Sequence, residues 1–206
     1  MGNFNITSGE KNSTNFHLTD TAGQIAPGQY GEAGYIVKSG FQYIYADSDF
    51  TFTLSNTSLA LGLVTPGVFS QGQTSLGVTT HSASGYIVYA QEEHPLKNPV
   101  SASVIPDTTC DTSTCSETTA AAWGTASNTG FGFTATGNDV LAAFAGGTAF
   151  KQFADASLSE APQAIMQNTG TALGRIGTVT YQLSVDGSQA AGNYETVIKY
   201  IATPGY

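Results

Sequence analysis

The stretch Gly177-Thr-Val-Thr-Tyr-Gln-Leu-Ser-Val-Asp-Gly187 decides the fold class of this chain. Its odd-numbered residues from Val179 to Val185 are apolar or aromatic, whereas the residues between them are Thr, Gln and Ser. A period of two is typical of a half-buried β-strand, because successive side chains point to opposite faces of the sheet. Asp186-Gly187 interrupts this pattern, and a second strand pattern runs from Tyr194 to Ala202 before Pro204. Together the two segments predict an antiparallel hairpin at the end of the chain.

Segments with strand composition also occur upstream, at Phe50–Ser55, Leu76–Thr80, Gly85–Ala90 and Gly130–Thr136. Gly85–Ala90 is apolar on both faces, which favours a central position in its sheet. About ten short strands separated by turn residues are typical of an antiparallel β-sandwich and not of βαβ units. We therefore expect an all-β protein, an immunoglobulin-like or jelly-roll-like sandwich with a long loop insertion and at most short helices.

Two segments have no clear strand pattern. Asp139–Ala154 fits either a short helix or a loop that covers the core, and Ser159–Gln167 is expected to be a short connection. Residues 91–126 form a longer polar segment that several prolines interrupt. An irregular insertion of this length is unusual in a compact domain and often carries function.

Cys110 and Cys115 are the two cysteines of the chain, and the four residues Asp-Thr-Ser-Thr separate them. A zinc site needs four ligands, and a thioredoxin-like pair has two intervening residues. The spacing therefore favours a structural disulfide over free thiols or a reactive pair. A disulfide implies an oxidising, extracytoplasmic compartment.

The composition is acidic and poor in charge. Charged residues make up 10% of the chain, and six Lys and Arg against fifteen Asp and Glu give a net charge of −9. Nucleic acids and anionic membrane surfaces require clustered cations, so both partners are excluded. No stretch has the length and apolarity of a transmembrane helix. The many Thr, Ser, Asn, Gln and Gly residues suit exposed strand faces and surfaces that contact other copies of the chain.

The N-terminal sequence Met-Gly-Asn-Phe-Asn-Ile lacks the basic and apolar regions of a signal peptide. The chain is therefore either cytosolic or an exported protein whose leader has been removed, and the disulfide favours export. We expect residues 1–40 to be a strand-forming extension and residues 41–206 to be the sandwich domain, with the loop insertion at 91–126.

Three short segments of the extension run from an aromatic residue through an aliphatic one towards glycine. One interpretation is three ordinary strands of a sheet. The other is a donor strand that pairs with the sheet edge of a neighbouring molecule. Its anchoring side chains would then be Phe4, Ile6, Phe16 and Leu18.

Glu92-Glu93-His94 is the best candidate for a reactive site, because a histidine beside two carboxylates could act as a base or a metal ligand. A solvated strand end is the more common role of such a group. The chain has neither a Gly-x-Ser-x-Gly motif nor His and Cys at the spacing of metal ligands. We therefore expect no enzyme and no cofactor.

Calcium is the one ion that the sequence leaves open. Asp47 with Asp49, or Asp107 with Asp111, could bind Ca²⁺ together with backbone carbonyls. Aspartate is also a frequent turn residue without any ion. Trp123, the single tryptophan, offers a comparable choice between a buried anchor under the long loop and an exposed platform for a sugar.

The segment Ala191-Gly-Asn-Tyr-Glu-Thr-Val-Ile-Lys-Tyr-Ile-Ala-Thr-Pro204 resembles the closing strand of a class of secreted bacterial β-sandwich proteins, and WxL-like surface domains have a comparable ending. Residues Asn15–Gln24 and Gly34–Phe41 resemble cell-surface proteins of uncultured bacteria. No Trp-x-Leu motif occurs, so the resemblance does not extend to peptidoglycan binding. It implies an exported β-sandwich at the cell surface and no particular activity.

Two functions are compatible with these features. The first is a non-enzymatic extracellular structural protein, a subunit of a surface fibre, pilus or layer whose partner is a second copy of itself. The alternative is an adhesin or carbohydrate-binding module that binds surface glycans through the 91–126 loop and Trp123.

Overall fold

The computed structural model describes residues 9–14, 16–20, 28–32, 35–39 and 50–205, and the chain divides into two compact units, Met1–Asp47 and Ser48–Tyr206. In the first unit, β1 (Gly9–Ser13) pairs antiparallel with β2 (Phe16–Asp20), and β3 (Gly28–Glu32) pairs antiparallel with β4 (Tyr35–Ser39). The described strands of this unit therefore form two separate hairpins.

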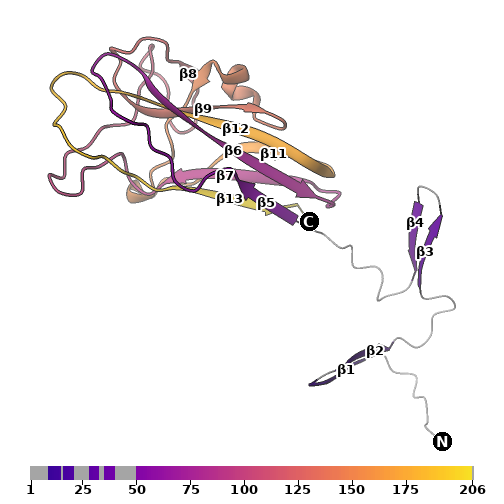
Figure 1. Cartoon of the computed structure of the whole chain (residues 1–206). Helices are drawn as coiled ribbons and strands as arrows, with labels where there is room; N and C mark the ends of the chain where they lie inside the picture. Colours follow the sequence, from indigo (N-terminus) through magenta and orange to yellow (C-terminus); the bar gives the residue numbers. More distant parts are fainter. Residues whose placement is uncertain (1–8, 15, 21–27, 33–34, 40–49, 206) are drawn as a thin grey trace, which may run out of the picture. The chain divides into compact units, whose positions relative to one another are not determined.

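The second unit is a sandwich of two antiparallel sheets (Figure 1). One sheet has the strand order β5-β6-β12-β9, and the other has the order β11-β7-β13. The short strands β8 and β10 pair with each other in a separate two-stranded sheet. The strands are β5 (Phe50–Leu54), β6 (Ser70–Thr80), β7 (Tyr86–Glu92), β8 (Ala121–Ala122), β9 (Gly130–Gly137), β10 (Ala149–Phe150), β11 (Gln163–Asn168), β12 (Ala172–Ser184) and β13 (Ile198–Pro204). The helical content of this unit is two short 3₁₀ helices, η1 (Ala142–Gly147) and η2 (Ala156–Leu158). These features confirm the all-β sandwich fold.

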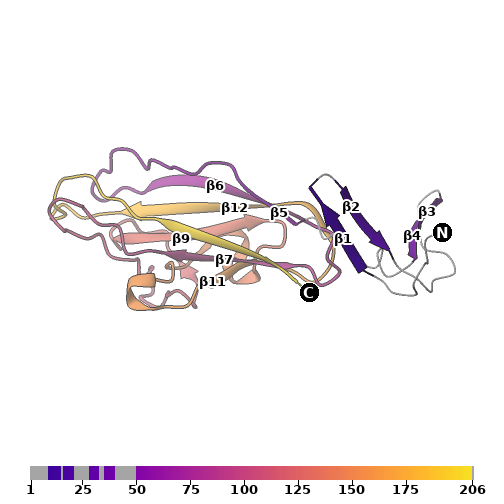
Figure 2. The ribbon, with the colours of Figure 1, turned by 90° about the horizontal axis from the view of Figure 1, so that it is seen from below.

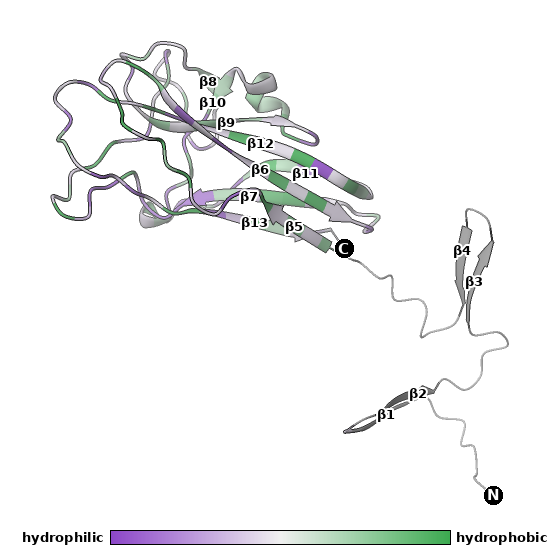
Figure 3. Cartoon of the chain, in the orientation of Figure 1, coloured by the Kyte–Doolittle hydropathy of each residue, from purple (hydrophilic) through white to green (hydrophobic). Residues whose placement is uncertain are grey.

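The hydrophobic core lies between the two sheets, which Figure 2 shows from a second direction. Along the strands, hydrophobic residues alternate with less hydrophobic ones (Figure 3). In β7 the alternation is regular, since every second residue from Tyr86 to Glu92 is buried. Phe153 stacks on Phe133 with a centroid distance of 4.0 Å, and Phe131 and Tyr181 extend this aromatic cluster.

The expected C-terminal hairpin is wrong. β12 pairs with β6 and β9, whereas β13 pairs with β7 in the opposite sheet. The chain between them crosses from one layer of the sandwich to the other, and the side chains meet again across the core, where the hydroxyls of Tyr181 and Tyr200 lie 2.6 Å apart. A period of two shows which face of a strand is buried, but it does not identify the strand's partner.

Three other segments can be compared with the sequence-based expectations. β7 is the central strand of its sheet, as its two apolar faces predict. The undecided segment Asp139–Ala154 contains η1 and the short strand β10. The expected connection Ser159–Gln167 is wrong in part, because it contains all but the last residue of β11, which pairs with β7 despite its mixed composition.

Candidate functional site

The edge of β6 is only partly covered by a neighbouring strand. β12 pairs with β6 along nearly its whole length, but β5 pairs only with residues 76–80. One further residue is bonded on this side, since Ser55 N–H donates to the Ser75 carbonyl (2.9 Å) and Ser75 N–H donates to the Ser55 hydroxyl (2.9 Å). Residues 70–74 therefore have no strand partner at this edge.

A loop, not a strand, runs along this free edge. The Ser70 hydroxyl donates to the Leu61 carbonyl. A Cβ placed on Gly72 would lie 2.8 Å from a methyl group of Leu59 and 2.9 Å from one of Leu61. The absence of a side chain at Gly72 thus makes room for these two leucines. The contact is by side chains, so the loop lies against β6 without extending the sheet.

A groove of about 1050 Å³, lined by apolar and polar residues, lies next to this edge and includes Thr74 of β6. It is bordered by residues from 54–66 and from 185–200, and it reaches inward to the core residues Phe131, Tyr181 and Leu183. Leu63 at the border is 97% exposed. A groove that joins exposed leucines to the core, beside a free strand edge, can receive an extended peptide with alternating apolar side chains.

The groove carries negative charge. The charged residues among those that line it are Asp186 and Glu195. Hydrogen bonds from the hydroxyl and the amide of Ser188 to the Asp186 carboxylate lower the pKa of Asp186, so that it is ionised at neutral pH. The groove therefore favours a neutral or basic peptide over an acidic one.

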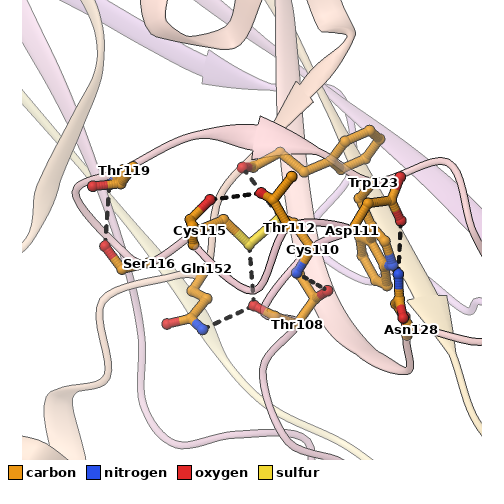
Figure 4. Close-up of a disulfide and its surroundings, with 12 residues drawn as sticks. Thr108, Cys110, Asp111, Thr112, Cys115, Ser116, Thr119, Trp123, Asn128 and Gln152 are labelled. Atoms are coloured by element: carbon orange, nitrogen blue, oxygen red, sulfur yellow. Dashed lines mark hydrogen bonds between the residues drawn. A yellow bond between two sulfur atoms is a disulfide. The ribbon is translucent and has the colours of Figure 1, made fainter.

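The long loop contains a second, smaller core around the cysteines (Figure 4). Cys110 and Cys115 form a disulfide, which confirms the expectation from their spacing. Trp123 is 2% exposed, packs edge-on against Phe69 and Phe150, and donates its indole N–H to the Asn128 carbonyl (2.7 Å). The alternative role of Trp123 as a sugar platform is therefore not supported, because neither solvent nor a ligand can reach its ring.

Asp111 holds this loop closed. Its carboxylate accepts hydrogen bonds from the backbone N–H of Gly124 (2.8 Å), the backbone N–H of Thr125 (3.1 Å) and the side-chain amide of Asn128 (2.9 Å). These bonds, that of Gly124 first, lower the pKa of Asp111. Asp107 is instead half-buried beside Glu92, so Asp107 and Asp111 do not form a shared cation site. Asp47 and Asp49 lie outside the described residues.

The structure separates the members of Glu92-Glu93-His94. Glu92 is fully buried, Glu93 forms an exposed ion pair with Lys199 (3.8 Å), and Nδ1 of His94 lies 2.8 Å from the carbonyl of Pro95. The three side chains therefore do not converge on a reacting group. Within the part of the chain that the structure describes, no group of three or more His, Cys, Asp or Glu side chains could hold a metal ion.

The four expected subunit-contact residues lie in the first unit. Phe4 and Ile6 are outside the described residues. Phe16 and Leu18 are on β2, opposite Ser13 and Lys11 of β1. One edge of β2 is thus already paired with β1 of its own hairpin.

The groove was not anticipated from the sequence. Its leucines at 59, 61 and 63 alternate in the sequence as in a strand, yet the segment forms no strand. Nothing local shows that β5 is too short to cover β6. Comparisons with protein-family models, with curated proteins and with solved structures find no match. No helix among the described residues is long and apolar enough to cross a membrane.

Proposed function

We propose that the protein is an extracellular structural protein, a subunit of a cell-surface fibre, pilus or layer that assembles by β-strand addition. The observation that carries the proposal is the free edge of β6 at residues 70–74 beside a groove that reaches the core. An edge without a strand partner can pair with an extended strand of another molecule, and here the covering loop contacts residues 70–72 without forming a ladder with them.

The strand that we propose for the groove is the N-terminal segment of a second copy, around Phe4 and Ile6. In an extended conformation these two side chains point to the same face, where they would meet the apolar residues of the groove. Residues 1–8 contain no charged side chain, which suits the acidic border. A free edge of five residues is about 16 Å long, so a segment of five or six residues can pair with it.

The binding free energy of one N-terminal segment in the groove of a second copy is expected to be modest. Burial of the Phe and Ile side chains contributes roughly 1.5–3 kcal/mol each, before the entropic cost of ordering the segment. Backbone hydrogen bonds to the free edge add to this. Phe16 and Leu18 then have a secondary role, because β2 already pairs with β1. Assembly would depend on many such contacts along a fibre.

A proline at Gln73 tests the acceptor edge. The backbone N–H of Ser75 points to the open side, and alternate residues of an antiparallel strand share this direction, so the N–H of Gln73 points there too. Gln73→Pro removes that donor and leaves the ladder to β12 in place. Gln73→Ala is the matched control, since both variants lose the side-chain bond to Thr180 (3.2 Å).

We expect wild-type protein and Gln73→Ala to form oligomers or fibres in light scattering and electron microscopy. Gln73→Pro and the donor variant Phe4→Asp/Ile6→Asp should be monomers with nearly unchanged thermal stability. Leu158→Asp, a substitution of an exposed leucine in η2 outside the groove, controls for added charge. A wild-type monomer whose state is unaffected by deletion of residues 1–20, or fibres that persist in Gln73→Pro, would refute strand addition.

A further inference from the structure

Two carboxyl groups meet at the end of β7. Glu92 is 0% exposed, and the alternation along β7 points its side chain into the sandwich with Tyr86, Val88 and Ala90. Asp107, from the long loop, lies within hydrogen-bonding reach of it. The loop is joined to β9 beside this point, because Thr108 N–H donates to the Phe131 carbonyl (2.8 Å).

Three of the four carboxyl oxygens of the pair are buried without a hydrogen-bond donor. They are both side-chain oxygens of Glu92 and Oδ1 of Asp107. Ionised carboxylates can only accept hydrogen bonds, so two of them cannot satisfy each other. An unpaired buried charge is also costly, and a second one beside it costs more. The pair is satisfied when one carboxyl is protonated and donates to the other.

The surrounding charges act in the same direction. The ionisable groups that face the pair are Asp155 and Glu160, from the segment around η2, and both are acidic. The Asp155 carboxylate accepts from Ser157 N–H (2.7 Å), and the Glu160 carboxylate accepts from Asp155 N–H (2.8 Å), so neither is a hydrogen-bond donor to the pair. The ion pairs recorded among the described residues, Arg175–Asp139 and Lys199–Glu93, involve neither Glu92 nor Asp107.

We propose that Glu92 and Asp107 share one proton at neutral pH, and that this acid–carboxylate hydrogen bond fastens the long loop to β7 as a pH-sensitive latch. Below about pH 6 both groups are protonated, and at alkaline pH the shared proton is lost and two adjacent charges push the loop and the strand apart. The latch is independent of strand addition, because neither residue lines the groove.

The direction of the pH effect follows from the two pKa values. Burial is the main cause that raises the pKa of Glu92 from 4.5 to about 10 and that of Asp107 from 3.8 to about 6. The folded protein therefore binds more protons than the unfolded chain. The stabilisation from the pair is complete below about pH 4 and is lost as the pH rises through both values.

Glu92→Gln tests the latch, because its amide N–H permanently replaces the O–H of the protonated acid. Between about pH 6 and 10, the folded pair holds one proton and the unfolded pair holds none, so unfolding of the wild type releases one proton. The unfolding equilibrium constant therefore rises about tenfold per pH unit because of the pair. We expect Glu92→Gln to lose this slope and to be the more stable protein at pH 9. Glu93→Gln, a neighbouring substitution at an exposed carboxylate, should keep the wild-type slope.

The carboxyl carbons of wild-type Glu92 and Asp107, followed by ¹³C NMR from pH 4 to 11, give a test that does not depend on any variant. One of the two should remain protonated at pH 8. The proposal is overturned if both are ionised there, or if Glu92→Gln and wild type have parallel pH profiles. It is also overturned if Ca²⁺ raises the melting temperature of wild type but not of Glu92→Gln, since the pair would then hold a cation.

Discussion

Removal of the disulfide should destabilise the protein by a small and calculable amount. Cys110 and Cys115 are five positions apart, so the bond closes a very short loop. The chain-entropy relation for about six residues gives a loss of about 7 cal/mol/K in the unfolded state, or about 2 kcal/mol at 25 °C. The double variant Cys110→Ala/Cys115→Ala keeps small apolar side chains in this buried position. The expected loss is therefore close to the entropic value.

Scanning calorimetry at neutral pH measures this loss. For a protein of this size, about 2 kcal/mol corresponds to a fall in melting temperature of about 4–8 °C. Near-UV circular dichroism should show Trp123 still ordered below the transition, because Phe69 and Phe150 hold it from other segments. Wild-type protein treated with a reductant is the control and should show the same loss.

The reasoning would be refuted by a loss of less than about 0.5 kcal/mol, which would mean that the loop is already constrained in the unfolded chain. A loss above about 5 kcal/mol, with disappearance of the Trp123 signal, would also refute it. The small core of the loop would then depend on the covalent bond, and Asp111 and its three hydrogen bonds would not suffice to keep the loop closed.

Two further substitution sets test the packing of the sandwich. Tyr181→Phe or Tyr200→Phe alone should lower the free energy of unfolding, measured in urea, by about 1–3 kcal/mol, because the remaining hydroxyl loses its partner. The double variant should lose less than the sum of the two, and additive losses would show that the hydroxyls do not interact. Gly85→Ala should lower the free energy of unfolding by more than about 3 kcal/mol, because the residue has a φ of +75° and the new Cβ would lie 1.9 Å from the Asn168 carbonyl oxygen. Gly67→Ala is the control, since Gly67 has a φ of +74° but open space around it, and it should lose only about 1–2 kcal/mol. Equal losses would contradict the steric account.

Much of the candidate site depends on distances that no local pattern encodes. The free edge of β6 exists because β5 stops pairing at Leu76, and the groove exists because loops from 54–66 and 185–200 border the same part of the core. Glu92 is different in part. Its parity with Tyr86, Val88 and Ala90 is a local pattern that predicts an inward side chain, although its neighbours Glu93 and His94 resemble a solvated strand end. Its meeting with Asp107 is the part that no local pattern encodes.

The sequence by itself determined the class of fold and the disulfide, since the period of two and the short cysteine spacing are local properties of the chain. It also determined that Val179, Tyr181 and Leu183 of β12 face the core. Gln182 and Ser184 on the other face are buried as well, because they bond to the long loop, and the sequence does not show this. Only the tertiary structure decided that β12 and β13 belong to opposite sheets, that Trp123 is enclosed, and that Glu92 meets Asp107. These outcomes depend on which distant segments come together, and that choice is made by the burial of the whole core and not by any one strand.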